Sequence, residues 1–286
     1  MPGTKRSTCC RGNDCSSSPK LAYESGNSRH QTSMRVTVCE LPHEPVALCA
    51  AWADLCEHTS RQRSQLVLLP EFAMVEPVWE SENFDLEQWS AMESLSDNWL
   101  SRLPELRATH VVGTRPITCE GNRFNQGYMT SASHGVMPLR AKFFLPDQPG
   151  GWETRWFDKG DADFREYRAG ALSFGLNICT ELWALESYAM YARCGVHAIL
   201  SPRATASATI GKWLSAGVVA AVRSGAFSLS SNRVDPTGAC GGVGWIISPD
   251  GDVLATTSRD EPFVSVDLDL NAPLAAQASY PRYVFS

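Results

Sequence analysis

No stretch of this 286-residue sequence approaches the roughly 18 consecutive apolar residues that a membrane-spanning helix needs, and the first thirty residues lack the apolar core of a secretory signal. Excess positive charge is absent too, because 25 Lys and Arg against 31 Asp and Glu leave a net charge of −6, which disfavours binding to nucleic acid or an anionic membrane. The sequence has no Cys-x-x-Cys pair and no Gly-x-Ser-x-Gly, which argues against the common zinc spacings and against a serine hydrolase. We therefore expect a soluble, cytoplasmic protein that acts on small molecules and has no nucleic-acid or membrane partner.

The composition is that of an ordinary globular protein. Hydrophobic residues make up 43% and charged residues 20%, with 21 Gly and 17 Pro spread along the chain, which excludes collagen, coiled coil and wholesale disorder. The length suffices for one large α/β domain or two small ones. The ten cysteines, in a chain without an export signal, are expected to be reduced thiols and mostly small core residues.

Residues 1–33 differ from the rest of the chain, because they are rich in Ser and almost free of apolar runs. Such a segment cannot bury enough surface to order itself, so we expect a disordered tail followed by one folded domain over 34–286. A mitochondrial presequence is disfavoured because no basic amphipathic helix is visible. A zinc site is a weaker alternative for the soft ligands of this tail, which are Cys9, Cys10, Cys15 and His30.

From Met34 onward, strand-like and helix-like segments alternate. The β-branched run 35–41, the helical stripe 45–62 and the buried-type run 65–69 predict a β-α-β opening. A helix over 85–107 and a turn over 135–138 follow. Further strands are predicted at 110–117, 125–131, 171–179, 196–201, 226–233, 243–248, 252–257 and 262–268, with helices near 183–194 and 211–223. This pattern predicts a single α/β domain with a large sheet, or two packed sheets, and helices outside.

Reactive side chains follow two of the buried strands. Leu66–Leu69 leads into Glu71, and Leu172–Ile178 leads into Cys179. Ligand sites of α/β folds gather beyond the carboxyl ends of strands, so this placement is informative. Lys142, between the predicted turn and a loop rich in Gly and Pro, is a third candidate.

These residue types suit nucleophilic catalysis. A free thiol is only a few per cent ionised at neutral pH, so Cys179 needs a base or a positive neighbour. Glu71 can supply the first and Lys142 the second. Lys142 could also hold the oxyanion that forms when sulfur adds to a carbonyl, together with the backbone N–H of Thr180. The same Glu71, once protonated, can give its proton to a leaving nitrogen.

Together these motifs resemble the nitrilase superfamily of carbon-nitrogen hydrolases over roughly 34–284. The resemblance depends on three motifs in the right order: Pro70-Glu71-Phe72 after an apolar strand, Lys142 before a Pro-containing loop with Glu153-Thr-Arg-Trp-Phe-Asp-Lys-Gly-Asp161, and Gly175-Leu-Asn-Ile-Cys179-Thr-Glu181-Leu-Trp183-Ala-Leu-Glu186. Downstream landmarks also match, namely Gly195 to Ala204, Ser231-Asn232-Arg233-Val and Ser248-Pro-Asp250-Gly251-Asp-Val-Leu-Ala.

The resemblance implies a four-layer α-β-β-α sandwich with Glu71 as base, Lys142 as cation, Cys179 as nucleophile and Glu153 as a second, positioning carboxylate. It calls for no metal and no organic cofactor. Members commonly dimerise through helices near the nucleophile, so we expect a homodimer or a higher homo-oligomer that uses 185–194.

Each residue alone has a simpler interpretation. Glu71 could be a helix N-terminal carboxylate, Lys142 a solvated lysine and Cys179 a core thiol, and a Cys179–His pair is a further alternative because the chain has six histidines. The order in which Glu71, Lys142 and Cys179 occur in the sequence favours a catalytic triad of these three residues. Two other acids near the nucleophile, Glu181 and Glu186, are expected to shape the pocket or cap the following helix.

The residues after Cys179 distinguish only weakly between the reactions of the family, which are hydrolysis of amides, of carbamoyl amines and of nitriles. They look more like the Cys-x-Asp/Glu-x-Trp-x-x-Glu pattern of amidases and carbamoyl-amine hydrolases than the Trp-Glu-Asn of nitrilases. We therefore expect hydrolysis of a small amide or carbamoyl amine through a cysteine thioester, with nitrile hydrolysis, acyl transfer and a catalytically silent interaction protein as alternatives. Candidate substrate-binding residues are Thr180, Trp183, Arg203 and Trp213. Arg203 could bind a substrate carboxylate bidentately, which predicts a preference for acidic amides.

Overall fold

The computed structural model describes residues 32–131 and 134–285. Its strands are β1 (Ser33–Leu41), β2 (Leu66–Leu68), β3 (His110–Cys119), β4 (Asn122–Ser131), β5 (Gly135–Ala141), β6 (Tyr167–Ala169), β7 (Leu172–Leu176), β8 (Ala198–Arg203), β9 (Phe227–Arg233), β10 (Trp245–Ile247), β11 (Val253–Thr256) and β12 (Phe263–Asp269). Its helices are α1 (Pro45–Gln62), α2 (Leu86–Leu100), α3 (Glu153–Trp156), α4 (Leu185–Cys194), α5 (Ile210–Ser224) and α6 (Ala272–Gln277). Short 3₁₀ helices are η1 (Val78–Glu80), η2 (Leu103–Leu106), η3 (Cys179–Trp183), η4 (Ser207–Thr209) and η5 (Arg282–Val284).

The strands form two sheets that share β1. One sheet runs β5-β4-β3-β2-β1-β12 and the other β6-β7-β8-β9-β10-β11. The end of β1 joins them, because Glu40 and Leu41 pair in parallel with Asn232 and Arg233 of β9. The strands that lead into the reactive residues, β2 and β7, lie in different sheets and run parallel to their neighbours β1 and β8.

Strand side chains alternate between two apolar layers, as the period of a β-strand requires. In β2, Leu66 and Leu68 enter a central cluster that also holds Leu200 and Leu229 of the other sheet. Their neighbour Val67 points outward, toward the helices. The two sheets therefore pack face to face across a shared core.

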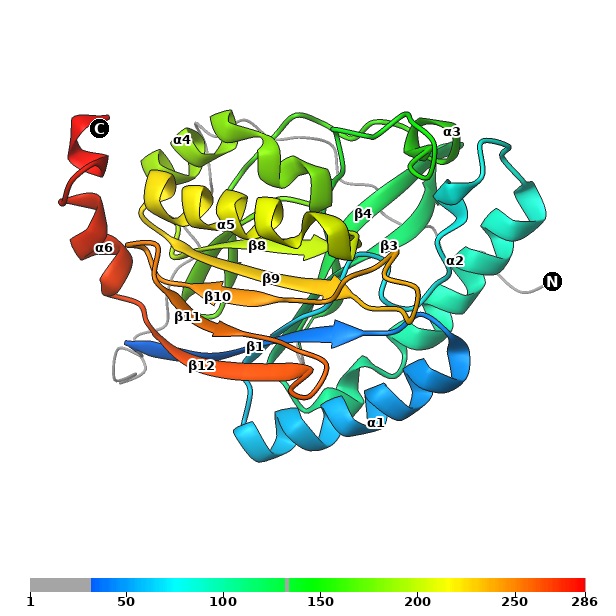
Figure 1. The fold of residues 1–286 in the computed structure, drawn as a ribbon, viewed down its shortest axis with the longest axis horizontal. Helices are drawn as coiled ribbons and strands as arrows, with labels where there is room; N and C mark the ends of the chain where they lie inside the picture. Colours follow the sequence, from blue (N-terminus) through cyan, green and yellow to red (C-terminus); the bar gives the residue numbers. More distant parts are fainter. Residues whose placement is uncertain (1–31, 132–133, 286) are drawn as a thin grey trace.

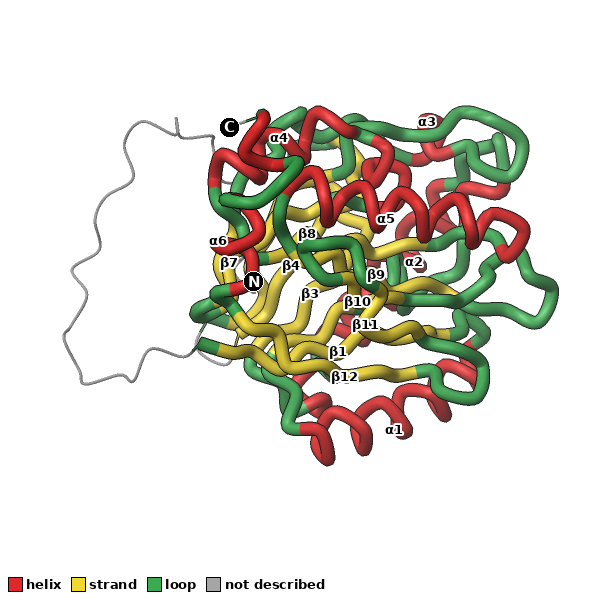
Figure 2. The backbone as a smooth tube through the Cα atoms, turned by 60° about the vertical axis from the view of Figure 1, so that its left-hand side comes forward, coloured by secondary structure: helices red, strands yellow, loops and turns green. Residues whose placement is uncertain are grey.

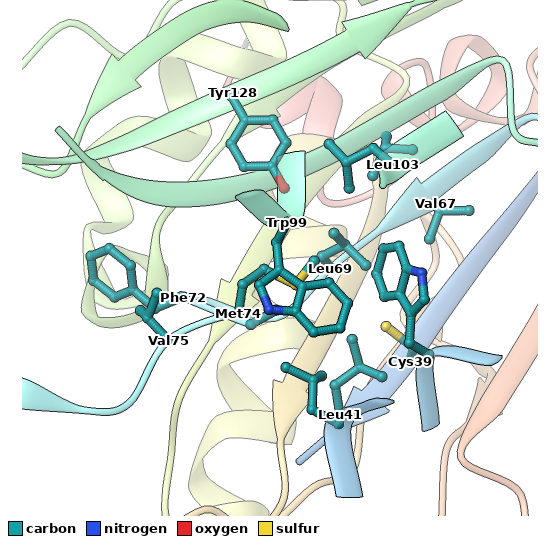
Figure 3. Packing of buried hydrophobic residues seen from close by; sticks show 14 of the residues in the cluster. Cys39, Leu41, Val67, Leu69, Phe72, Met74, Val75, Trp99, Leu103 and Tyr128 are labelled. Atoms are coloured by element: carbon teal, nitrogen blue, oxygen red, sulfur yellow. The ribbon is translucent and has the colours of Figure 1, made fainter. Parts of the chain in front are cut away.

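Helices cover both outer faces (Figure 1). α1 and α2 bury Trp52, Leu55 and Trp99 against the β1–β2–β3 sheet, in a cluster that Figure 3 shows from close by. α4 and α5 bury Tyr191 and Ala220 with other residues against the opposite sheet. Viewed from the side, strands occupy the middle of the molecule with helices outside (Figure 2). The predicted α/β fold class is confirmed, and the order of helices, two sheets and helices agrees with the predicted four-layer α-β-β-α arrangement.

Local sequence explains where α1 begins and ends. Glu44 accepts hydrogen bonds from the N–H groups of Val46 and Ala47 at 3.1 and 2.8 Å, and Pro45 starts the first turn, where its missing N–H costs nothing. The helix ends at Arg63 in the left-handed region, with φ 55°. This fixes the connection that leads into β2 and the Glu71 turn.

Two predicted elements differ in the structure. The helix predicted over 85–107 ends at Leu100, and Pro104 falls in the separate turn η2. The turn predicted over 135–138 is instead the first half of β5, which contains Pro138. β5 is an edge strand paired only with β4, and an edge strand tolerates a proline because one side of its backbone needs no ladder partner.

The tail and the zinc alternative at Cys9, Cys10, Cys15 and His30 lie outside the described residues. Cys119 is disulfide-bonded, so the expectation of reduced thiols is wrong at that position. Cys39, Cys49, Cys56, Cys179 and Cys240 carry free thiols. Within the described ranges, no helix has the length and apolar character that crossing a membrane requires.

Candidate active site

Glu71 lies in a tight turn directly after β2 and is 2% exposed. Its N–H donates to the Arg203 carbonyl at 3.2 Å. The next residue, Phe72, has φ 46°, and its N–H donates to Thr114 Oγ1 at 2.8 Å. A non-glycine residue in the left-handed region is strained, so these bonds hold the Glu71 turn in one conformation.

Lys142, one residue beyond β5, is fully buried between two carboxylates. Its Nζ lies 2.9 Å from Glu71 Oε1 and 2.7 Å from Glu153 Oε1. Burial by itself would lower the pKa of Lys142, but the two carboxylates outweigh it and raise that pKa above its ordinary value. Lys142 is therefore a permanent buried ammonium, suited to stabilising negative charge and unsuited to acting as a base.

Glu153 is the first residue of α3 and brings the second carboxylate to Lys142. Burial raises its pKa to about 7, with Lys142 acting in the opposite direction and Glu71 in the same one. Its Oε2 is buried without a hydrogen-bond partner. A buried acceptor that no protein group satisfies is available to a substrate N–H or a water.

Cys179 begins η3 directly beyond β7 and has φ 49°. Burial raises the pKa of its thiol well above the ordinary value, the Glu71 charge raises it further, and Lys142 lowers it. Glu71, Lys142 and Glu153 are thus the charged groups that act on the thiol. The resting residue is a neutral thiol, which needs a base before it can attack.

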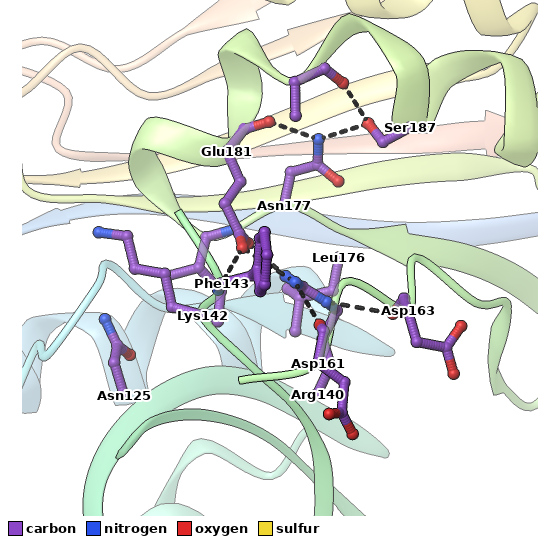
Figure 4. A network of polar contacts seen from close by, with 12 residues as sticks. Asn125, Arg140, Lys142, Phe143, Asp161, Asp163, Leu176, Asn177, Glu181 and Ser187 are labelled. Carbon is purple, nitrogen blue, oxygen red and sulfur yellow. Dashed lines mark hydrogen bonds and ion pairs between the residues drawn. The ribbon is translucent and has the colours of Figure 1, made fainter. Parts of the chain in front are cut away.

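The backbone before Cys179 is held by Glu181 (Figure 4). Glu181 Oε2 accepts the Ile178 N–H at 2.9 Å, and Oε1 accepts the Phe143 N–H at 2.7 Å. Both oxygens also bond the buried guanidinium of Arg140, one of them at 2.9 Å. Glu181 thus connects the segment that carries Lys142 to the turn that carries Cys179.

A family model described as carbon-nitrogen hydrolase matches residues 35–274. The chain belongs to the carbon-nitrogen hydrolase family. Its structure resembles a carbon-nitrogen hydrolase from Helicobacter pylori G27, with a TM-score of 0.77 and 18% identity over 88% of this chain and 94% of that one. Nit3 of Saccharomyces cerevisiae has a TM-score of 0.70 and 16% identity over 87% and 95% of the two chains.

An amidase from Nesterenkonia sp. AN1 is also similar, with a TM-score of 0.69 and 19% identity over 90% of this chain and 97% of that one. That structure is a variant in which the acetamide moiety of fluoroacetamide is covalently added at the active-site cysteine. A search of curated protein sequences gives no significant match.

Two polar residues of this carbon-nitrogen hydrolase escaped the sequence analysis. Asn125 of β4 is buried and donates from Nδ2 to Glu71 Oε1 at 2.8 Å. Arg140 lies on β5, two positions before Lys142, and residues two apart in an extended chain have side chains on the same face. That spacing is a signal that could have predicted Arg140, whereas nothing in the sequence marks Asn125.

The predicted substrate-binding residues do not all reach the site. Thr180 follows Cys179 in η3 and is half-buried. Trp183 is 47% exposed and lies against Trp213 of α5, with 5.4 Å between ring centroids. Their contact with substrate stays a prediction.

Arg203 does not fit the role predicted for it. The residue is fully buried, and its Nε, Nη1 and Nη2 donate to Ser230 Oγ at 2.7 Å, Thr205 Oγ1 at 2.7 Å and the Val243 carbonyl at 2.6 Å. Its guanidinium also lies 4.0 Å from the ring centroid of Trp245, in the layer under α5. Arg203 ties β8 to β9 and to the loop before β10 through all three of its side-chain nitrogens.

Replacing Glu181 by glutamine should lower the free energy of unfolding by about 2–3 kcal/mol, because the buried Arg140 charge loses its bidentate anionic partner. The measurement is urea unfolding of wild type and E181Q. Glu57→Gln is the control, since that exposed carboxylate of α1 should change the free energy of unfolding by less than about 0.5 kcal/mol. Equal stability of both variants would contradict this role for Glu181.

Proposed function

We propose that this protein hydrolyses the C–N bond of a small amide or carbamoyl amine through a thioester on Cys179. The observation that carries the proposal is the buried Lys142 ammonium in direct ion pairs with Glu71 and Glu153, at 2.9 and 2.7 Å, all three of which act on the pKa of the Cys179 thiol. Family membership and the fold shared with the Nesterenkonia amidase support it.

The acylation step uses Glu71 as base and then as acid. Glu71 takes the thiol proton of Cys179 as the sulfur adds to the substrate carbonyl carbon, forming the S–C bond. Lys142 and the Thr180 N–H stabilise the resulting oxyanion, each donor contributing on the order of 2.7–4 kcal/mol. When the C–N bond breaks, the proton on Glu71 goes to the nitrogen, which leaves as ammonia or an amine.

Deacylation runs the same groups a second time. Glu71 takes a proton from water while the oxygen adds to the thioester carbon, and Lys142 again stabilises the oxyanion. The C–S bond then breaks, the acid leaves, and the proton returns to the sulfur. Lys142 keeps its proton throughout, as the two carboxylates beside it require.

The test is ammonia release from an amide, a ureide and a nitrile that share one carbon skeleton. Wild type should turn over the amide or ureide at least about 100-fold faster than the nitrile, and Cys179→Ala should release none. Glu57→Gln, which changes an exposed carboxylate of α1, should match wild type. Undiminished release by C179A would refute the mechanism, and faster turnover of the nitrile would favour a nitrilase.

Acyl transfer is separated from hydrolysis by product analysis. Without hydroxylamine, the acid should be the main product of the amide reaction. With hydroxylamine added, only part of the acyl group should be diverted to hydroxamate. If no acid forms until an amine is added, the protein is an acyltransferase that uses the same acyl-enzyme.

We also propose a homodimer through the face beside the nucleophile turn. Trp183 of η3, Leu185 of α4 and Val219 of α5 are large apolar side chains that stay exposed there. Light scattering should give the mass of two chains for wild type and of one chain for Leu185→Asp. A monomeric wild type would contradict the proposal.

A further inference from the structure

The two arginines at the ends of β8 and β9 face opposite sides of their sheet. Arg203 shares the outer side with Ser230, its hydrogen-bond partner. Ser231, the next residue of β9, points inward, because its Oγ donates to the Leu68 carbonyl of β2 at 2.6 Å. Arg233 lies two residues further on and therefore leaves the strand toward the same inner side, at the end of β2 where Glu71 lies.

The contacts of Arg233 confirm this direction. Its Nη1 donates to the Phe72 carbonyl at 3.2 Å, one residue beyond Glu71, and its guanidinium carbon lies 5.9 Å from the ring centroid of Trp79. Glu71 is also one of the charges that act on its pKa. Arg233 thus borders the candidate active site, although its backbone belongs to a strand far from Glu71 in sequence.

One edge of this guanidinium has no partner. Arg233 is fully buried, and both its Nε and its Nη2 lack any hydrogen-bond partner. In an arginine, the Nε–H and the Nη2–H point the same way from one edge of the planar group, at the spacing of two carboxylate oxygens. Nη1, the nitrogen bonded to Phe72, lies off that edge, so the edge as a whole is unsatisfied.

The neighbouring acids do not neutralise it. Burial lowers the pKa of Arg233, and Glu71, Glu80 and Asp235 act on it in the opposite direction without a direct contact. Among the described residues, none of these three carboxylates forms an ion pair with Arg233. Glu71 is committed to Lys142, and Asp235 accepts the Thr237 and Gly238 N–H groups. A buried, unpaired cation is costly, and such groups are retained where a ligand completes them.

We propose that Arg233 binds a carboxylate of the substrate through its Nε and Nη2 edge, so that the preferred substrates are small amides or ureides that carry a carboxylate. This inference extends the proposed function and gives Arg233 the role that the sequence had suggested for Arg203. The carboxylate lies on the Glu71 side of the reacting carbon.

The experiment compares an acidic amide with an uncharged analogue in which a hydroxymethyl group replaces the carboxylate. Arg233→Gln should raise KM for the acidic amide about 10- to 100-fold, the range expected for lost charged hydrogen bonds, and leave kcat within about threefold. Both parameters for the uncharged amide should stay within about threefold. Arg61→Gln, which removes an exposed arginine of α1, should leave KM and kcat unchanged for both substrates.

Binding to the inactive C179A variant supplies a measurement that does not depend on folding of R233Q or on turnover. By calorimetry, C179A with Arg233 intact should bind the acidic amide at least about 10-fold tighter than the uncharged one. Equal affinities, or equal losses for the two substrates in R233Q, would overturn the inference while leaving the amidase proposal intact. If wild type releases ammonia from neither amide, the proposed function fails, and calorimetry still decides the role of Arg233.

Discussion

Replacing Lys142 by methionine should abolish turnover and lower the free energy of unfolding by about 3–5 kcal/mol. The side chain keeps a similar volume, but Glu71 and Glu153 then face each other in the interior without the ammonium that pairs with both. Removing one partner of a buried ion pair leaves an uncompensated charge, which is the origin of the stability loss. The measurements are ammonia release and urea unfolding at neutral pH.

The pH dependence of K142M distinguishes this cause from simple misfolding. Burial already raises the pKa of Glu153 to about 7, and loss of Lys142 removes the charge that opposes the rise. A carboxyl whose pKa is higher in the folded protein binds protons more tightly there, so the folded state gains stability as pH falls and loses it as pH rises through that pKa. The stability deficit of K142M should therefore shrink between pH 7 and pH 5. A deficit that is constant over this range would contradict the carboxylate pair as its source.

Glu71→Gln should lower kcat by about 10²–10⁴-fold with little change in stability. The side-chain amide oxygen introduced by this substitution can still accept hydrogen bonds from Asn125 and Lys142, but it cannot take the thiol proton. Because burial raises the pKa of Cys179, the sulfur stays protonated without that base. Steady-state kinetics and thermal unfolding of E71Q test both parts.

An activated ester separates the two roles of Glu71 in that variant. A p-nitrophenolate leaves without being protonated, so the ester needs Glu71 only as a base, and E71Q should still release p-nitrophenol at least about 100-fold more slowly than wild type, because nothing takes the Cys179 proton. Equal turnover of the ester by E71Q and wild type would contradict the role of Glu71 as the catalytic base.

The parts of the site that could be predicted from sequence are those set by short-range patterns. Glu71 and Cys179 each follow a run of apolar residues, and a buried strand delivers the residue after it to the open end of the sheet. Lys142 is a candidate from its place between a predicted turn and a loop, but the strand before it is not predicted, because Pro138 is typical of a turn. Edge pairing, which tolerates that proline, is a property of the assembled sheet and not of the segment.

The choice between Arg203 and Arg233 illustrates what the sequence does not contain. Both residues end strands whose sequences predict burial, and both are followed by loops. Which of them faces the site depends on the register of β8 against β9 and on which face of the sheet meets the other sheet. Arg203 pairs with Asn232, so it and Arg233 fall one position out of step and point to opposite faces. Only the pairing of β8 with β9 in the folded protein distinguishes Arg203 from Arg233.

The most direct test of the central claim is the mass of the protein during turnover. Wild type mixed with the amide and quenched in acid within milliseconds should carry one acyl group, and digestion should place it on the peptide that contains Cys179. C179A mixed with the same amide should show none. An acyl group on another residue, or full amide turnover by C179A without any adduct, would contradict covalent catalysis by this thiol.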